Sequence, residues 1–377
     1  VSGHAYKSGT NYWIKPNGTV QIKIFNTQSY NGTKFQLDDY INNNNLRMYN
    51  SGVDAQASMN YSGTTSYFKT NTELDITKNT VARANGNRDL TTTFNVKAKV
   101  AGKAYQIHNY SESKNGKKVD YTASGNYLKT DGTAPSGTLS PNSSTWTNSN
   151  VTVSFNPSDS ESGVKRWRWR TSADNGSNYG EWSAYIDGDT TSNITVSATA
   201  SNKLQVQVED NVGNVGTVTS GTYQVDKTAP GGTIAGNPTA WTNKDVTLSV
   251  TATDAGGSGV KSIKKPDGTI VTGSTLSLVV GANSTQDFVV TDNAGNTKTI
   301  SASITKIDKT LPTLTVNAST TAWTNSSVTL TATGADTGGA GVQSITLPNG
   351  TVVTGATGSQ AVTENGTYTF KVTDNAG

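Results

Sequence analysis

The chain has 377 residues, of which 32% are hydrophobic and 15% charged, and it contains no cysteine. This length exceeds one β-sandwich core and fits three or four domains, while the lack of cysteine excludes disulfides and thiolate zinc sites. The formal charge of +3 is too small and too dispersed to predict a nucleic-acid-binding surface, and no apolar run reaches the roughly 18 residues of a membrane span.

Residues 1–130 predict an enlarged and divergent β-sandwich, which we take as the candidate ligand-binding domain. Trp13 precedes an alternating strand at residues 20–24, and Tyr105 with Ile107 introduces a hairpin like that of the later segments. An Asn-rich insertion surrounds Asn42–Asn45, and a short helix is predicted near Asp38–Met48. The first residue is Val1 rather than Met, which indicates a processed end or an excised fragment.

Three following segments, residues 131–225, 226–307 and 308–377, repeat one sequence pattern. Each opens with an Asp-x-Thr-x-Pro linker that starts at Asp131, Asp226 or Asp308. Eleven residues after each Pro comes a Trp-Thr-Asn entry, at Trp146, Trp241 and Trp323. Thirteen residues after each Trp stands an Asp, at Asp159, Asp254 and Asp336. The closing Asp-Asn-x-Gly signatures begin at Asp210, Asp292 and Asp374, 82 residues apart, which identifies tandem repeats.

The second repeat shows the strand pattern most clearly. Val246, Leu248, Val250 and Ala252 alternate with polar residues, as a half-buried β-strand requires. Residues 266–269 and 292–296 predict hairpin turns, because Gly accepts the positive φ of such turns. About seven short strands in some 80 residues predict an immunoglobulin-like sandwich. The overall prediction is therefore an all-β chain of tandem immunoglobulin-like β-sandwiches arranged end to end, because the Pro-containing linkers are short.

The first repeat carries thirteen extra residues between its Trp and its closing Asp. They lie in the region from the Arg-Trp-Arg-Trp-Arg strand at residues 166–170 to a second predicted strand, Glu-Trp-Ser-Ala-Tyr, at residues 181–185. Along the first strand Trp167 and Trp169 share one face, which a sandwich core would bury, and the Arg side chains share the other. The alternative is an exposed aromatic patch that contacts a glycan, with the candidate residues Trp167, Trp169, Tyr179, Trp182 and Tyr185.

The linker, the Trp-Thr-Asn entry, the Ser-Gly-Val turn and the Asp-Asn-Ala-Gly-Asn hairpin resemble bacterial immunoglobulin-like repeats of large surface proteins of Firmicutes. The first repeat also looks like the variant that accompanies secreted glycoside hydrolases and sialidases. The resemblance covers residues 131–377 well and residues 1–130 weakly. It implies an extracellular, cell-surface or secreted setting and a spacer or adhesive role rather than a reaction.

The recurring tryptophans and aspartates each allow a structural and a functional interpretation. Trp146, Trp241 and Trp323 are predicted to pack on the edge or core of their own sandwich rather than to stack on sugars. The aspartates of successive loops should converge at one pole, where Ca²⁺ would find several carboxylates. The alternative, which we favour, is that these side chains cap turns. The candidate Ca²⁺ ligands fall in two junction sets: Asp226, Asp254 and Asp292; Asp308, Asp336 and Asp374.

No catalytic motif accompanies these features. Only two histidines occur, and no nucleophile elbow, zinc-protease motif or phosphate-binding loop is present, so the sequence predicts no enzyme and no cofactor other than candidate Ca²⁺. The leading hypothesis is a bacterial surface stalk or adhesin whose partner is a cell-surface glycan or an extracellular protein. The alternatives are an accessory, carbohydrate-binding region of a secreted glycoside hydrolase and a phage or filament fibre protein.

The third repeat reaches Gly377 directly after its closing signature, without a counterpart of the strand that contains Ile300, Ala302 and Ile304. A sandwich without that strand leaves Phe370 and Val372 on an unpaired edge. We therefore expect the polypeptide to continue with a strand of about eight residues and a further linker. The alternative is that a neighbouring subunit donates the strand and produces self-association.

Overall fold

The computed structural model describes residues 2–3, 5–27, 29–30, 33–34, 41–50, 53–60, 65–69, 73–84, 89–113 and 118–377. All regular elements in these ranges are β-strands, and none of the described residues forms a helix long and apolar enough to cross a membrane. The chain divides into two compact units. One comprises Val1–Ser144, Val151–Val196 and Ser201–Tyr223, and the other comprises Thr145–Asn150, Ser197–Ala200 and Gln224–Gly377.

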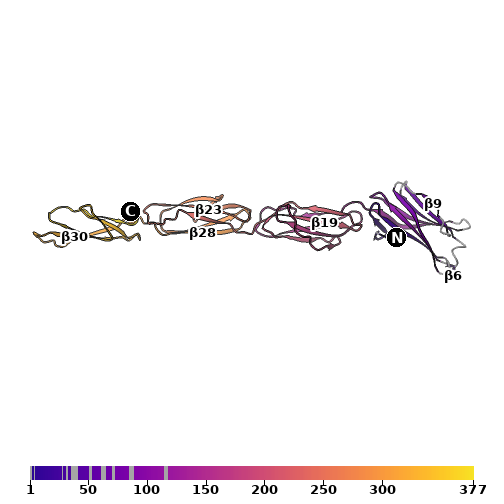
Figure 1. The fold of residues 1–377 in the computed structure, drawn as a ribbon, viewed down its shortest axis with the longest axis horizontal. Coiled ribbons are helices and arrows are strands. Elements are labelled where there is room, and N and C mark those ends of the chain that lie inside the picture. Colours follow the sequence, from indigo (N-terminus) through magenta and orange to yellow (C-terminus); the bar gives the residue numbers. More distant parts are fainter. Residues whose placement is uncertain are drawn as a thin grey trace. The chain divides into compact units, whose positions relative to one another are not determined.

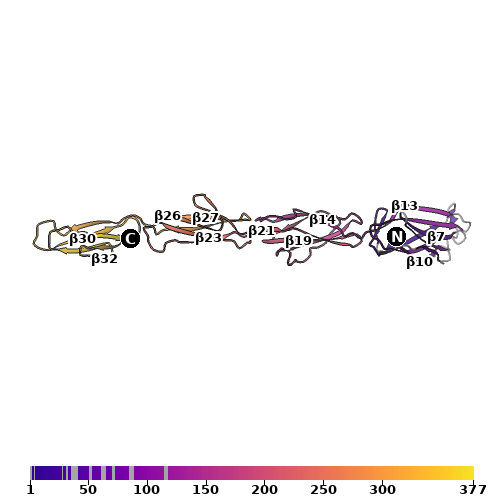
Figure 2. The same ribbon diagram turned by 90° about the horizontal axis from the view of Figure 1, so that it is seen from above.

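The N-terminal region is a sandwich of a four-stranded and a seven-stranded sheet. The smaller sheet has the order β1 (Ser2–Gly3), β4 (Thr19–Thr27), β11 (Asp89–Ala98) and β10 (Leu74–Ala84). The larger sheet has the order β2 (Tyr6–Ser8), β3 (Asn11–Ile14), β13 (Lys118–Thr130), β12 (Ala104–Ser113), β7 (Ile41–Asn50), β8 (Val53–Asn60) and β9 (Thr65–Lys69), and a separate hairpin joins β5 (Ser29–Tyr30) to β6 (Thr33–Lys34). Figure 2 shows β10 and β13, one from each sheet, on opposite faces.

Both N-terminal sheets contribute to one core. Ile14 of β3 and Leu128 of β13 meet Val20 of β4 and Phe94 of β11 in a single buried cluster. The helix predicted near Asp38–Met48 is wrong where it can be checked, because residues 41–50 form β7, which pairs along its length with β8 and β12. Pairing on both edges satisfies the backbone groups of β7, so tertiary context decides over local helix propensity. Residues 38–40 lie outside the described residues.

The first repeat consists of two further sheets. One has the order β14 (Ser136–Ser140), β15 (Val151–Ser158) and β18 (Ser192–Val196). The other has the order β17 (Ile186–Asp187), β16 (Val164–Ser172), β19 (Ala200–Asp210) and β20 (Val215–Thr219), with β21 (Tyr223–Val225) also paired to β19. Buried residues alternate along β15 and β19, so each strand turns one face to the core.

The second repeat has the seven strands that its sequence predicts. One sheet has the order β22 (Gly231–Ala235), β23 (Val246–Thr253) and β26 (Thr275–Val280). The other has the order β25 (Ile270–Thr272), β24 (Val260–Lys264), β27 (Ser284–Asp292) and β28 (Thr297–Ile304). Figure 1 labels β23 and β28, one from each sheet. Alternation along β23 is strict, and the predicted turns contain Gly268 and Gly295 at φ of 89° and 95°. The immunoglobulin-like prediction is confirmed.

The third repeat forms two three-stranded sheets. One sheet has the order β29 (Thr313–Ala318), β30 (Val328–Ala335) and β33 (Thr357–Val362). The other has the order β32 (Val352–Thr354), β31 (Val342–Thr346) and β34 (Lys371–Asp374). In the second repeat, β28 covers the outer edge of β27, whereas no strand within residues 118–377 covers that edge of β34. The chain is thus an all-β protein made of tandem β-sandwich domains.

Candidate metal centres

Three clusters of carboxylates recur at equivalent places in the repeats. In each cluster, three aspartates from the linker, the loop after the second strand and the closing hairpin offer ligand oxygens that lie within 4.8 Å of one another. The structure therefore brings together both predicted junction sets. It adds a third set in the first repeat. The clusters are Asp131, Asp159 and Asp210; Asp226, Asp254 and Asp292; Asp308, Asp336 and Asp374.

The linker aspartate joins two successive domains through its own backbone and side chain. Asp226 donates its backbone N–H to the carbonyl of Thr147, in the Trp-Thr-Asn entry of the preceding domain. Its carboxylate accepts the N–H groups of Thr228 at 2.9 Å and of Ser258 at 3.1 Å, both in the following domain. Asp308 repeats these contacts with Thr242, Thr310 and Ala340. Each cluster therefore lies where one domain meets the next.

The loop aspartate closes a tight turn. Asp254 accepts the N–H groups of Gly256 at 3.1 Å and Gly259 at 2.8 Å. A Cβ atom at Gly256 would lie 1.9 Å from Asp226 Oδ1, so this position requires glycine because of close approach to the linker carboxylate. Gly338 stands in the same relation to Asp308.

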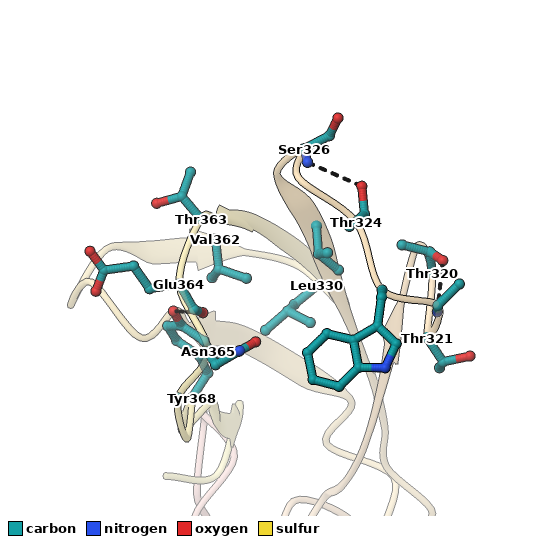
Figure 3. A pocket seen from close by; sticks show the side chains of 14 residues that line it. Thr320, Thr321, Thr324, Ser326, Leu330, Val362, Thr363, Glu364, Asn365 and Tyr368 are labelled. Carbon is teal, nitrogen blue, oxygen red and sulfur yellow. Dashed lines mark hydrogen bonds between the residues drawn. The ribbon is translucent and has the colours of Figure 1, made fainter.

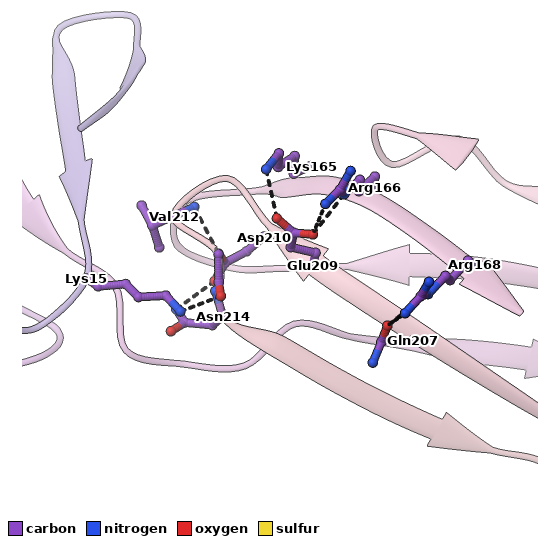
Figure 4. Close-up of polar contacts among 10 residues, drawn as sticks. Lys15, Lys165, Arg166, Arg168, Gln207, Glu209, Asp210, Val212 and Asn214 are labelled. Carbon is purple, nitrogen blue, oxygen red and sulfur yellow. Dashed lines mark hydrogen bonds and ion pairs between the residues drawn. The ribbon is translucent and has the colours of Figure 1, made fainter. Parts of the chain in front are cut away.

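The closing hairpin supplies the third carboxylate and two asparagines. Asp292 accepts the backbone N–H of Asn296 at 2.8 Å and its side-chain amide at 2.8 Å, and that amide also donates to the Asp226 carbonyl at 2.9 Å. Asn293 donates to the carbonyls of Ser258 and Gly259, which fixes the hairpin to the loop. Figure 4 shows the equivalent bonds from Asn214 and Val212 to Asp210 in the first repeat. The linker, loop and hairpin aspartates thus all accept backbone N–H groups of their own turns, which is the turn capping that we favoured.

Capping leaves the charge of the clusters unbalanced. Asp226 and Asp292 are fully buried, and no Lys or Arg in the part of the chain that the structure describes forms an ion pair with any of the nine aspartates. Burial opposes ionisation of Asp226, but hydrogen bonds from Ser258 and Thr228 outweigh it and lower the pKa of that carboxyl. Hydrogen bonds from Ala340 and Thr310 lower the pKa of Asp308. Asp226 and Asp308 are therefore ionised at neutral pH.

The cluster of the first repeat, which the sequence prediction omitted, contains a fourth carboxyl group. Glu161 stands two residues after the loop aspartate, the position that Gly256 holds in the second repeat. Burial and a hydrogen bond to Asp131 raise the pKa of Glu161. Burial also raises the pKa of Asp210. Asp159 Oδ2 and Glu161 Oε2 are buried without a hydrogen-bond partner. The shared linker, loop and hairpin signatures could have identified this cluster, because Asp131, Asp159 and Asp210 occupy the same three positions as the predicted sets.

The donor set fits a hard divalent cation. Every candidate ligand atom is a carboxylate oxygen, and Ca²⁺ takes six to eight oxygen ligands from carboxylates, carbonyls and water. A carboxylate oxygen that accepts one N–H retains a second lone pair for a metal. The unpartnered oxygens of Asp159 and Glu161 make the first cluster the best fit. Metal binding itself stays a prediction.

The three recurring tryptophans lie outside the cores. Trp146 and Trp241 are half-buried, and Trp323 is 97% exposed. A Cβ atom at Gly339 would lie 3.3 Å from the ring of Trp241, and one at Gly257 would lie 3.7 Å from the ring of Trp146. The prediction that each Trp packs in its own sandwich is therefore corrected: the rings of Trp146 and Trp241 approach the Gly-rich loop of the following repeat. The adjacent Thr147 and Thr242 form parallel bridges with Val225 and Ile307, the residues directly before the next linker.

The predicted aromatic patch of the first repeat divides between core and surface. Trp167 is fully buried and packs against Phe155 with ring centroids 5.0 Å apart, so a glycan cannot reach it in the folded domain. Tyr179, Trp182 and Tyr185 lie on the opposite face, where the guanidinium groups of Arg166, Arg168 and Arg170 stack on them at 3.9 to 4.9 Å. Trp169 is half-buried.

Residues 181–185, predicted as a strand, form none. Ser183 donates its N–H to the Trp169 carbonyl at 2.7 Å, but its side-chain oxygen, not its carbonyl, accepts the Trp169 N–H at 3.0 Å. The hydroxyl thus replaces a backbone acceptor of the ladder and interrupts regular pairing with β16. The segment instead presents its aromatic rings to the Arg row, whose side chains also donate to Gln207, Gln205 and Glu209 of β19. Figure 4 shows two of these pairs.

Comparisons with known proteins find distant likeness in fold. No family model matches the chain, and no curated protein matches it. A marsupial T cell receptor covers 77% of this chain and 97% of its own, at 11% identity and a TM-score of 0.36. The match to the mouse nectin-like molecule 4 ectodomain (Ig1–Ig3) covers 78% of this chain and 96% of that ectodomain, at 11% identity and a TM-score of 0.30. The match to the fibronectin(III)-like modules of Clostridium thermocellum CbhA covers 44% of this chain and 91% of those modules, at 14% identity and a TM-score of 0.23. At these scores the matches carry no argument about function.

Proposed function

We propose that the chain is a non-catalytic, extracellular array of immunoglobulin-like domains that serves as a spacer or adhesive stalk on a bacterial surface, with Ca²⁺ bound at the domain junctions. The observation that carries this proposal is the threefold recurrence of one carboxylate cluster where a linker enters the next domain. A cation bound there cross-links the linker, a loop and a hairpin. Three links of this kind would limit motion between successive domains.

The chemistry of the clusters favours a cation over a catalytic role. The aspartates are held by backbone N–H groups, and the two chain histidines lie elsewhere in the sequence. Ligands that are already oriented by hydrogen bonds lose little conformational entropy on binding an ion. A like-charged cluster gains most from such an ion, because the ion removes the mutual repulsion of the carboxylates.

Two further roles remain alternatives to the stalk. The chain would fit an accessory region of a secreted glycoside hydrolase, or a fibre protein of a phage or filament. Glycan contact in the first repeat would use Tyr179, Trp182 and Tyr185, of which Tyr185 is 39% exposed. Their stacking on Arg side chains covers ring faces that a sugar would need, so we rank glycan contact below a structural role.

Calorimetric titration of Ca²⁺ into the intact chain tests the proposal. We expect up to three ions to bind per chain, and Asp210→Asn to remove one of them. Asparagine keeps an oxygen that accepts the Asn214 N–H, so the turn should persist while the charge is lost. Asp187→Asn is the matched control, because Asp187 is an exposed carboxylate outside the clusters. Absence of binding, or equal stoichiometry in both variants, contradicts the proposal.

A further inference from the structure

The first repeat carries a row of cations that the other two repeats lack. Arg166, Arg168 and Arg170 of β16 lie on one face of the strand, because alternate residues share a face. The register that pairs Val164 with Asp210 identifies the residues at the places of Arg166 and Arg168 in the second and third repeats: Ser262 and Lys264; Ser344 and Thr346. Two of the three sandwiches therefore form without the Arg row, so the fold does not require it.

Aromatic rings hold the guanidinium groups of this row by stacking. The ring centroid of Trp182 lies 4.8 Å from the guanidinium carbon of Arg168 and 4.4 Å from that of Arg170. Tyr185 lies 4.7 Å from Arg168, and Tyr179 lies 4.9 Å from Arg170. Stacking uses the faces of the rings, whereas the N–H groups lie in the guanidinium plane and can still donate hydrogen bonds.

The neighbouring strand accepts some of these N–H groups, and it does so with uncharged side chains. Gln207 Oε1 accepts from Arg168 Nε at 2.9 Å and from Arg168 Nη2 at 2.7 Å. Gln205 Oε1 accepts from Arg170 Nε at 2.8 Å. Each guanidinium has five N–H donors, so these two amide oxygens leave donors at the Nη end of both groups.

The charge of the row is balanced at one end only. Lys165 and Arg166 share the carboxylate of Glu209, each at 2.7 Å. Among the residues that the structure describes, no carboxylate forms an ion pair with Arg168 or Arg170. Figure 4 shows this contrast between the Glu209 ion pairs and the Arg168 bond to a glutamine. Two half-buried cations about 7 Å apart therefore lack an anion.

The surface beside these cations is polar and carries no further acid. Lys203 lies on the same face of β19 as Gln205 and Gln207. On the next strand, Thr217 and Thr219 are exposed and pair in register with the two glutamines. The face thus combines positive charge with amide and hydroxyl groups, which suits a partner that has both anionic groups and hydroxyls.

The geometry argues against other polyanions. Because the ring faces are occupied by guanidinium groups, nucleobases have no free platform for stacking. An acidic peptide that adds as a strand needs a free edge, but β16 pairs with β19 on one side. On its other side lie β17 and residue Ser183, which is hydrogen-bonded to Trp169.

The hollow beside the Trp323 loop of the third repeat does not share this character. It has a volume of about 430 Å³, and Glu364, Thr320 and Thr324 are among the residues that line it, whereas no Lys or Arg does. Figure 3 shows the carboxylate of Glu364 at its margin. This hollow offers no cation to an anionic partner.

We infer that the Arg face of the first repeat binds an acidic polysaccharide, a hydroxyl-rich chain that bears carboxylate groups. The carboxylates accept N–H groups from Arg168 and Arg170, and the hydroxyls bond to the glutamine and threonine side chains. This inference rests on the proposed extracellular, adhesive role and names the partner class for it. Contact is made through the guanidinium edges, so the covered ring faces do not hinder it.

Titration of oligogalacturonate, a linear chain with one carboxylate per sugar, into the intact protein tests the inference. The titration contains a chelator, because carboxylates of the sugar chain would also bind Ca²⁺. The decisive variant is Gln205→Glu combined with Gln207→Glu, which gives Arg168 and Arg170 internal carboxylates as Glu209 does for Arg166. We expect it to weaken binding about 100-fold, about tenfold for each charge-assisted contact that is lost. Melting curves in the same buffer should show no loss of stability.

The matched control is Thr247→Glu combined with Thr251→Glu. Both threonines are exposed in β23 of the second repeat, so this variant adds the same two charges away from the Arg face. At physiological salt it should leave the Kd unchanged, because exposed charges beyond the screening length contribute little. Neutral dextran should not bind. Absence of oligogalacturonate binding, equal weakening in both double variants, or equal binding of dextran overturns the inference. No arm of the experiment requires Ca²⁺, so its failure and failure of the proposed Ca²⁺ sites are distinguishable.

Discussion

Trp167, in β16 of the first repeat, is the largest fully buried side chain among the described residues. Its ring packs on Phe155 at a tilt of 57°, and its strand pairs with β19 through Val208. Trp167→Ala should lower the free energy of unfolding of this repeat by about 3–5 kcal/mol, because it removes contact area and leaves a cavity. Guanidinium unfolding followed by circular dichroism measures this loss.

The matched variant is Trp167→Phe. The indole N–H of Trp167 is buried without an acceptor, so phenylalanine removes an unsatisfied donor as well as some volume. We expect a smaller loss than for Trp167→Ala, at most about 2 kcal/mol. Equal losses for the two variants would show that the ring contributes little through packing.

Alternation predicted the burial of Trp167 but not the different surroundings of the other aromatics. A period of two places Trp167 and Trp169 on one face. It does not predict that Tyr179, Trp182 and Tyr185 stack on the Arg side chains of the opposite face. The recurring tryptophans were misplaced for a related reason. A fixed position in a repeat indicates a structural role, but does not say whether the partner lies in the same domain or the next.

The loop of Gly256 shows how one element depends on another. Gly256 faces the linker carboxylate so closely that a side chain cannot enter without displacing Asp226. Gly256→Ala should therefore destabilise the second repeat by about 1–3 kcal/mol through overpacking. Thermal unfolding of the chain measures the effect on this repeat.

Gly231→Ala is the control for Gly256→Ala. A Cβ atom at Gly231 would have its nearest neighbour, Thr253 Oγ1, at 3.9 Å, which is ordinary contact. We expect a change within about 0.5 kcal/mol. If both variants lose the same stability, loss of glycine flexibility rather than the Asp226 contact explains the effect.

The sequence predicts a strand well where one face of the strand is buried and the other is exposed, and less well where no such alternation is present. The strict alternation of β23 and the Gly turns of its domain specify strand, face and hairpin from local sequence alone. Residues 41–50 contain consecutive asparagines and no clear period, so only pairing with β8 and β12 decides their conformation. Such long-range pairing is not encoded in any short window.

For the whole molecule, the repeat period predicted the tandem sandwiches and the convergence of the linker, loop and hairpin aspartates. The sequence prediction restricted the clusters to junctions between recognisable repeats, and so omitted Asp131, Asp159 and Asp210. The N-terminal domain nevertheless makes the same junction. Asp131 donates its N–H to the Ile14 carbonyl, next to Trp13, as Asp226 does to Thr147 beside Trp146. The sequence of the N-terminal domain differs too much from the repeats for this shared backbone hydrogen bond to be predicted from it.

Melting of the intact chain with Ca²⁺ and with a chelator tests the central claim most directly. If the clusters bind the ion in the folded state alone, Ca²⁺ at about 1,000 times its Kd adds about 4 kcal/mol of stability per site. We predict that the chelator lowers the melting temperature, and that Asp210→Asn, Asp292→Asn and Asp374→Asn combined abolish the difference. Identical melting curves with Ca²⁺ and with chelator would contradict the account and leave the aspartates as turn caps only.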